Sequence, residues 1–376
     1  VTELARGIAS LNERIIQARS VSATDSPNDL LDQRDEALRQ LSELVSYTTS
    51  VQDGDIVNVF IGGGQALVLG TQSNDIIAVQ NEFDPSRYEL AVELGGAPQI
   101  VTGSFKGGQV GGLIEYRDQA LDSAISGIGL LALSFTEVMN NQHRAGIDLD
   151  GAAGIDFFTP IDTEAAKKQR ITAAAGNIEP DDRDVAVAID NIAALTGDEY
   201  ILRLSGAGPL NYTVVRSSDG AVLEDGLLLS TPPQTITTEL GFSVELRAGS
   251  FQDGDAYFVR PTRFSAANID LNLTEAGTLA LGSPIRADAS LGNSGSGVIL
   301  PGGVINVNDV DIGTLGAFAN PGALVPPLLI RFTSATTYDV LDNSDPTNPQ
   351  QLIPPLRNQP FVPNQSNPLL PFDSGA

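Results

Sequence analysis

Acidic side chains are the most abundant residues in this sequence that could do chemistry. One run, SPNDLLDQRDEALRQLSELV at 26–45, contains Asp29, Asp32, Asp35, Glu36 and Glu43. Asp32 and Glu36 stand four residues apart and would share a helix face, as metal-binding carboxylates do, but no histidine lies near them. Asp35 and Arg39 form a favourable i, i+4 pair. We therefore interpret these acids as a charged helix surface.

A second acidic pattern lies in GIDLDGAAGIDFF at 146–158. Asp148, Asp150 and Asp156 match positions 1, 3 and 9 of a calcium-binding loop. Alanines occupy positions 5 and 6, and a threonine occupies position 12, where the loop needs an oxygen ligand, a glycine and a glutamate. The three aspartates are thus the candidate metal ligands, but an Asp/Gly turn whose phenylalanines fill a core fits the sequence better.

His143 is the single histidine and follows NNQ at the end of a long helical pattern. No serine in a nucleophile-elbow context and no patterned acid stand near it in the sequence. A cation near a helix C-terminus is stabilised by the helix dipole, so we predict a structural role. The glycine-rich runs GGGQ and GNSGSG lack the phosphate-binding pattern, so we expect no cofactor and no enzymatic activity.

Composition limits the possible partners. The 376 residues carry a formal net charge of −26, with only three lysines and no cysteine. Nucleic acid and anionic membranes are bound by clustered basic residues, so we expect neither as a partner. No apolar run reaches the roughly 18 residues of a membrane span.

Three segments place apolar residues at heptad spacing, which is typical of helices packed along one another. The N-terminal pair is expected to fold back as two neighbouring helices, the second starting with Ser26 as cap, Pro27 at the first position and Asp29 as a capping-box acid. The third segment is expected to pack against this pair. The predicted packing residues are Val1, Leu4, Ile8, Leu11, Ile15, Leu31, Leu38, Leu41, Val45, Leu121, Ile128, Leu131, Phe135 and Val138.

The remaining pattern is mainly that of β-structure. Residues 47–69 read as strands joined by an Asp-Gly turn and a Gly-Gly-Gly turn, and further short strands are expected at 76–80, 87–94 and 98–102. After Gly146, runs such as YILRLSG and FSVELRA indicate a sandwich or small barrel. We predict an α+β multidomain chain with a helical rod or bundle domain carrying a β-hairpin excursion, followed by β-rich outer domains. The expected segments are 1–145, 146–264, a return segment 265–288, and a Pro/Gly-rich variable domain 289–376.

Four quoted segments occur in a fixed order: NDLLDQRDEALRQLSELV, VQDGDIVNVFIGGGQALVLG, GGLIEYRDQALDSA and NNQHRAGIDLDGAAGIDFF. Together they resemble the flagellar hook-associated protein 1 family, the hook–filament junction proteins of bacterial flagella. The resemblance is clear over about residues 1–160, continues as strand pattern and short pieces to about 288, and gives way to a variable region.

The resemblance implies a structural protein without catalysis. It implies export through the flagellar type III apparatus to an extracellular position, and packing with the hook protein and a second junction protein. It also implies self-association in a ring in the full-length protein, and an export chaperone whose site we expect outside this chain. The terminal helices that drive polymerisation in the family are not matched, so we expect a piece lacking both terminal helical regions.

Two other functions stay open from the residues alone. The acidic β-regions and the aspartates at 148–156 fit a secreted adhesin or calcium-dependent binding module. A carbohydrate-active hydrolase would need two facing carboxylates, and the abundance of acids singles out no pair.

We predict that this chain alone is monomeric, because the helices that polymerise the family are not matched in it. Analytical ultracentrifugation should give a monomer mass that does not change with concentration. Ordered rings or tubes would contradict the prediction.

Overall fold

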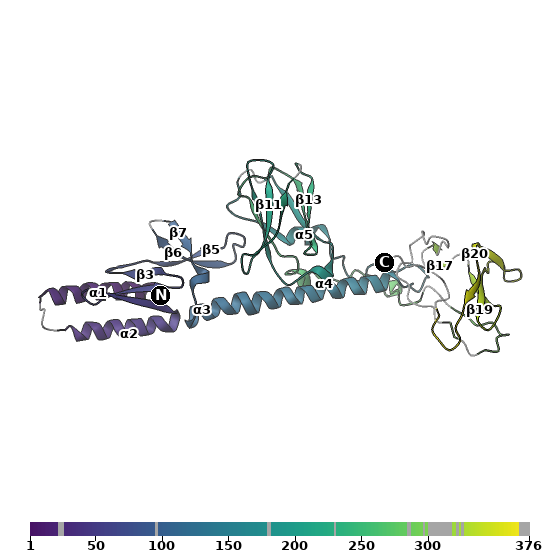
Figure 1. Cartoon of the computed structure of the whole chain (residues 1–376), viewed down its shortest axis with the longest axis horizontal. Coiled ribbons are helices and arrows are strands. Elements are labelled where there is room, and N and C mark those ends of the chain that lie inside the picture. Colours follow the sequence, from purple (N-terminus) through teal and green to yellow (C-terminus); the bar gives the residue numbers. More distant parts are fainter. Residues whose placement is uncertain are drawn as a thin grey trace. The chain divides into compact units, whose positions relative to one another are not determined.

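The computed structural model describes residues 1–21, 26–94, 97–178, 182–228, 231–283, 287–295, 298–299, 318–320, 323–324 and 327–367. The chain divides into two compact units, one of Val1–Leu130 with Glu164–Ala266 and one of Leu131–Thr163 with Ala267–Ala376. The fold mixes helices with antiparallel sheets (Figure 1), which confirms the predicted α+β class. The four sequence segments remain a prediction.

The helices of the described residues include one long helix built from three consecutive parts. Their bounds are α1 Thr2–Val21, α2 Asn28–Leu44, α3 Gly108–Glu115, a π-helical turn Tyr116–Leu121, α4 Asp122–Arg144 and α5 Glu164–Gln169, with short 3-10 turns at Thr102–Ser104, Ile192–Ala194, Ser265–Asn268 and Ala276–Thr278.

The strands form six antiparallel sheets in the described residues, in the orders β1-β2-β3-β4, β5-β6-β7, β12-β11-β10-β15-β8, β13-β14-β9, β16-β17 and β18-β19-β20. Their bounds are β1 Tyr47–Gln52, β2 Ile56–Ile61, β3 Gln65–Leu69, β4 Gln72–Ser73, β5 Ile76–Gln80, β6 Tyr88–Leu94, β7 Ala97–Ile100, β8 Ile171–Ala173, β9 Asp184–Ile189, β10 Tyr200–Ser205, β11 Asn211–Arg216, β12 Val222–Leu227, β13 Gln234–Thr237, β14 Phe242–Ala248, β15 Ala256–Val259, β16 Phe318–Asn320, β17 Ala323–Leu324, β18 Leu328–Phe332, β19 Thr337–Asp342 and β20 Gln350–Pro360.

The N-terminal helices and the first sheet share one hydrophobic core. Ile8 of α1, Leu41 of α2 and Val59 of β2 are fully buried in it. Asn12 is also fully buried, and its amide bonds the Val57 carbonyl at 2.8 Å and the Gly70 carbonyl at 2.7 Å. Because a buried amide is tolerated only when it is hydrogen-bonded, these contacts fix α1 against the sheet.

Residues 164–266, called the β lobe below, contain two antiparallel sheets that face each other. The rings of Tyr200 in β10 and Phe242 in β14 lie 5.1 Å apart, and both side chains are buried. Runs predicted as strands, such as YILRLSG and FSVELRA, are β10 and β14. The run VINVND at 304–309, whose alternating pattern also predicts a strand, lies outside the described residues.

The start of α2 differs from the sequence prediction. The helix begins at Asn28 with Pro27 as N-cap, and no side chain caps it. Instead, the Pro27 carbonyl accepts hydrogen bonds from the amides of Leu30 and Leu31. The capping box at Ser26 and Asp29 was therefore wrong, because proline occupies the capping position and offers only a carbonyl.

The largest correction concerns the third apolar stripe. The nine predicted packing residues of the N-terminal helix pair, from Val1 to Val45, are buried or half-buried. Leu121, Ile128, Leu131, Phe135 and Val138, by contrast, are 44% to 71% exposed. The expected packing of this stripe within the chain was therefore wrong. Heptad spacing reports that a face needs a partner but does not say which one.

Gly129 of α4 explains how the helix and the β lobe approach so closely. A Cβ built on Gly129 would lie 1.9 Å from the Thr262 carbonyl oxygen, which is far inside contact distance. Gly127, two residues earlier, has no atom within 4 Å of such a Cβ. The helix thus contains one glycine that the contact requires and one that it does not.

We predict that Gly129→Ala lowers the stability of the chain by about 1–3 kcal/mol, because helix and β lobe must move apart. Gly127→Ala is the matched control and should raise stability by about 0.5–1 kcal/mol through helix propensity. Thermal and urea unfolding would measure both. Equal effects of the two substitutions would contradict this explanation of Gly129.

Candidate packing surface

The acids of α2 form a solvated surface. Arg39 Nε lies 2.8 Å from Glu36 Oε2, and Arg39 Nη1 lies 2.6 Å from Glu43 Oε1. Hydrogen bonds from Arg39 and Gln40 lower the pKa of Glu36 to about 2. Glu36 is therefore ionised at neutral pH and unsuited to proton transfer. Arg39 pairs with Glu36 and Glu43, and not with Asp35 as the spacing had indicated.

The candidate calcium loop does not bring its aspartates together. Asp148 Oδ1 accepts hydrogen bonds from the amides of Asp150 and Ala152, at 2.9 and 2.8 Å, which closes its own turn. Asp156 pairs with Arg144. Within the described ranges, no three acidic or histidine side chains are grouped to hold a metal ion. This geometry fits the Asp/Gly turn that the sequence favoured, because a carboxylate that accepts neighbouring amides stabilises a turn without a cation.

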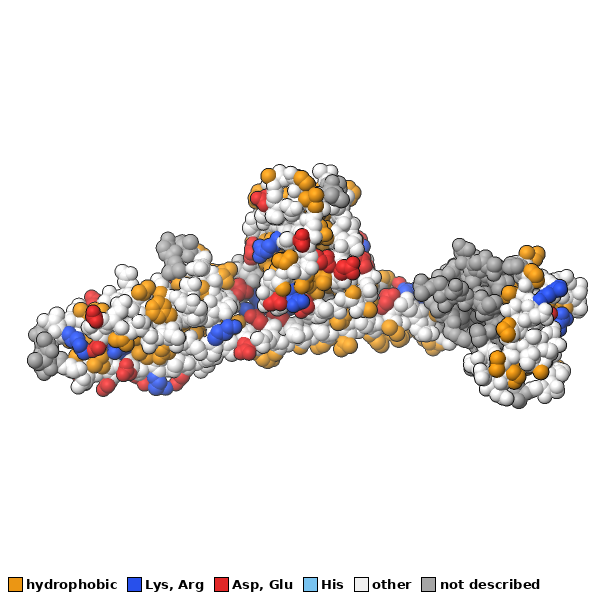
Figure 2. Space-filling model, in the orientation of Figure 1, with side chains coloured by type: hydrophobic (Ala, Val, Ile, Leu, Met, Phe, Trp, Pro, Cys, Tyr) orange, Lys and Arg blue, Asp and Glu red, His pale blue; other side chains and the backbone are white. Residues whose placement is uncertain are grey.

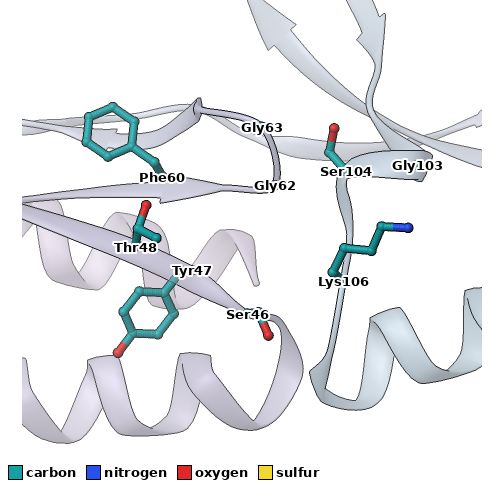
Figure 3. A pocket seen from close by; sticks show the side chains of 9 residues that line it. All are labelled: Ser46, Tyr47, Thr48, Phe60, Gly62, Gly63, Gly103, Ser104 and Lys106. Atoms are coloured by element: carbon teal, nitrogen blue, oxygen red, sulfur yellow. The ribbon is translucent and has the colours of Figure 1, made fainter.

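A shallow hollow of about 370 Å³ lies beside the first sheet. Figure 3 shows Thr48 and Phe60 on its two strands and Lys106 on the loop beside them. Tyr47 points instead toward α2, where its hydroxyl donates to the Leu38 carbonyl at 3.0 Å. The lining residues include no acid and no histidine, so the hollow lacks a pair for acid–base or nucleophilic chemistry.

His143 is a buried structural residue. Its Nδ1 lies 2.5 Å from the Ile155 carbonyl oxygen, and its Nε2 accepts the Ala280 amide at 2.9 Å. A ring that donates through one nitrogen and accepts through the other is the neutral tautomer. The predicted structural role fits this geometry, but the predicted positive charge at the helix end does not.

Asn140 supports the same loop one turn earlier. Its amide nitrogen donates to the Phe158 carbonyl at 3.1 Å, and its oxygen accepts the Phe158 amide at 2.8 Å. One side chain therefore satisfies both backbone groups of a single residue. Asn140 and His143 together hold the segment 146–158 against α4. Sequence reasoning missed Asn140, although its spacing of three residues from His143 was the available signal.

The buried face of α4 is rich in polar side chains. The buried residues at steps of 3, 4, 3, 4 and 3 along this face are Ser126, Gly129, Leu133, Thr136, Asn140 and His143. Four of these six residues, Ser126, Thr136, Asn140 and His143, have polar side chains. The exposed stripe defined above carries the large apolar side chains, with Leu113 and Tyr116 continuing it through α3 and the π-turn. The usual arrangement of a helix on a globular protein is thus inverted.

Figure 2 shows hydrophobic side chains gathered along this helix. A contiguous apolar surface of this kind marks a protein or membrane contact. By length and composition alone, Gly108–Arg144 could cross a membrane, although it contains no uninterrupted apolar run of that length. The polar face argues for a protein contact, since polar side chains on a membrane helix must be satisfied by other helices or a cavity.

Known proteins resemble this chain over most of its length. Residues 1–158 match the family model described as the flagellar hook-associated protein FlgK helical domain. Flagellar hook-associated protein 1 of Escherichia coli is 30% identical over 366 residues, which are 94% of this chain and 62% of that protein. The protein of the same name from Salmonella typhimurium is 30% identical over 297 residues, 77% of this chain and 50% of that protein.

A solved structure agrees with these sequence matches. The flagellar hook junction protein FlgK from Burkholderia pseudomallei superposes with a TM-score of 0.67 at 28% identity, covering 91% of this chain and 57% of that one. The chain therefore spans between one half and about 62% of the length of these relatives.

We predict that His143→Ala destabilises the chain by about 2 kcal/mol or more, because it removes the partners of the buried Ala280 amide and the part-buried Ile155 carbonyl. Urea unfolding would measure the loss, and hydrogen exchange should show faster exchange of the Ala280 amide. Gln142→Ala, at an exposed position of the same turn, is the control. If both variants behaved alike, His143 would not hold these segments.

Proposed function

We propose that this chain belongs to the flagellar hook-associated protein 1 family and is part of a structural subunit at the junction between hook and filament. Members of this family are components of the bacterial flagellum, outside the cell. In our proposal the subunit acts by packing against other protein surfaces and catalyses no reaction.

One observation carries the packing mechanism, namely the exposed apolar stripe of the helix 108–144. Its side chains repeat at steps of 3 and 4 from Ile128 to Val138, the spacing with which one helix packs on another. Exposing leucine, isoleucine and phenylalanine costs about 1.5–3 kcal/mol each relative to burial. A contact that covers this stripe is therefore strongly favoured.

The partner that we propose for the stripe is a helix with matching apolar spacing from the assembled flagellar junction. The net charge of −26 supports this choice. Like-charged subunits repel at a distance, and an uncharged stripe offers a surface where they can approach. The hook protein, a second junction protein and further copies in a ring are the proposed neighbours, and type III export is the proposed route.

The chemistry of the described residues supports a role without catalysis. Both ring nitrogens of His143 are occupied by backbone groups. The acids of α2 are exposed, and the candidate metal ligands hold a turn and an arginine. These observations remove the specific support for a calcium-dependent module.

We predict that replacing Ile128, Leu131 and Val138 together with glutamine abolishes swimming without unfolding the protein. The three side chains are more than half exposed, so the isolated chain should keep its stability within about 0.5 kcal/mol. The full-length protein carrying the substitutions should fail to support motility in soft agar, and immunogold labelling should find fewer filaments on the hooks.

The matched control is Ser123→Gln with Gln142→Ala, both at exposed polar positions of α4. It should leave motility and stability unchanged. Normal motility of the stripe variant would overturn the packing role. A large drop in the stability of its isolated chain would show instead that the stripe is part of this chain's own core.

A further inference from the structure

A group of arginines and carboxylates surrounds the π-helical turn, away from the apolar stripe. Arg87, just before β6, places Nη2 2.7 Å from Asp118 Oδ1 and 2.8 Å from Asp122 Oδ2. Arg263, in the β lobe, places Nη2 2.8 Å from Asp122 Oδ1 and Nη1 2.8 Å from Glu199 Oε1. Asp122 therefore binds one arginine from each of two separate parts of the first unit.

We propose that Asp122 is the positioning residue of a joint, formed with Arg87 and Arg263, that fixes the orientation of the β lobe on the helix. Its two carboxylate oxygens bind different arginines, so a single side chain connects the β5-β6-β7 sheet, the helix and the β lobe. This role concerns the fold of the first unit and is independent of the proposed junction function.

Burial makes these contacts stronger than ordinary surface ion pairs. The side chains of Asp122, Glu199 and Arg263 are only 14%, 14% and 17% exposed. Exposed pairs contribute little because water and salt screen them, whereas partly buried charge pairs are screened much less. Burial lowers the pKa of Arg263, but the hydrogen bonds to Asp122 and Glu199 and the attraction of their charges outweigh it, so the pKa is raised.

Asp122 is difficult to replace because its carboxylate lies between two arginines. Removing its charge leaves the guanidinium groups of Arg87 and Arg263 close together without the carboxylate between them. Such a loss includes repulsion between the two arginines as well as the loss of one ion pair with each of them. Because Arg263 is the β-lobe residue that binds Asp122, we expect the lobe to move away from the helix when this contact is lost.

Other contacts of the β lobe do not involve Asp122. Arg260 lies over the rings of Phe258 and Phe264, at 5.2 and 4.8 Å, and 3.5 Å from Asp84. Phe258 also packs on Phe83, with ring centroids 5.4 Å apart. These contacts tie the lobe to the 83–84 loop, so loss of Asp122 should release the lobe from the helix while the lobe itself stays folded.

The matched control is Asp118. It lies in the same turn and also contacts two arginines, Arg87 at 2.7 Å and Arg117 at 2.7 Å, but neither arginine belongs to the β lobe. Asp118 is also 43% exposed. Asp118→Asn therefore removes a similar number of ion pairs and leaves the contact between Asp122 and Arg263 of the β lobe intact.

The absence of cysteine permits a direct test in the whole chain. Spin labels at Ser10→Cys in α1 and Ser218→Cys in the β11–β12 turn, both exposed positions, report the distance between helix pair and β lobe by pulsed electron resonance. The unsubstituted background and Asp118→Asn should give one narrow distance. Asp122→Asn should lose it and give a broad or shifted distribution, and Asp122→Glu should restore a narrow one.

A narrow, unshifted distance in Asp122→Asn would overturn the proposal, as would equal broadening in Asp118→Asn. Circular dichroism shows whether each variant folds. Should Asp122→Asn unfold, Arg263→Lys is measured instead, since a lysine keeps the charge but cannot bridge Asp122 and Glu199 with two separate nitrogens. An unchanged distance in a folded Arg263→Lys would then refute the joint.

Discussion

The structure depends most on the inverted polarity of the helix 108–144, which buries polar side chains and exposes apolar ones. The polar side chains find hydrogen-bond partners within the chain; Asn140 and His143, for example, bind backbone groups. The apolar side has no comparable cover among the described residues. In water such a face raises the free energy of the isolated chain by an amount that a partner can recover. The helix is thus a folded element of this chain, and in our proposal it is also half of an interface.

Local signals in the sequence predicted the elements well. The Asp-Gly turn at 53–54 joins β1 to β2, and Gly54 has a φ of 85°, a conformation that favours glycine. The strands expected at 76–80 and 87–94 correspond to β5 and β6 within a residue. These features are set by side chains close in sequence, where period and turn chemistry suffice. The predicted cap of α2 was wrong although it is also a local feature, because the choice between Ser26 and Pro27 as N-cap depends on one pair of backbone angles.

The contacts that matter most for the site could not be predicted in this way. His143 accepts an amide from Ala280, 137 residues away, and Asp122 binds Arg263, 141 residues away. Neither partner carries a motif that identifies it in advance. The apolar stripe was visible as a heptad pattern, but period alone does not distinguish a core face from an interface face. Only burial of the opposite, polar face decides between them.

The π-helical turn explains how one helix keeps both faces over its whole length. With the exposed Ala124 included, the exposed apolar positions from Leu113 to Val138 advance by 3 or 4 residues, except between Tyr116 and Leu121, where they advance by 5. In a regular α-helix this step would rotate the later residues by about 140° from Tyr116, whereas a π-turn has more residues per turn and absorbs most of that rotation. The structure places the π-helix at Tyr116–Leu121. Asp118 in this turn and Asp122 directly after it both bind Arg87. A single irregular turn therefore keeps the apolar stripe on one side of the helix, and directly after it Asp122 holds the β lobe.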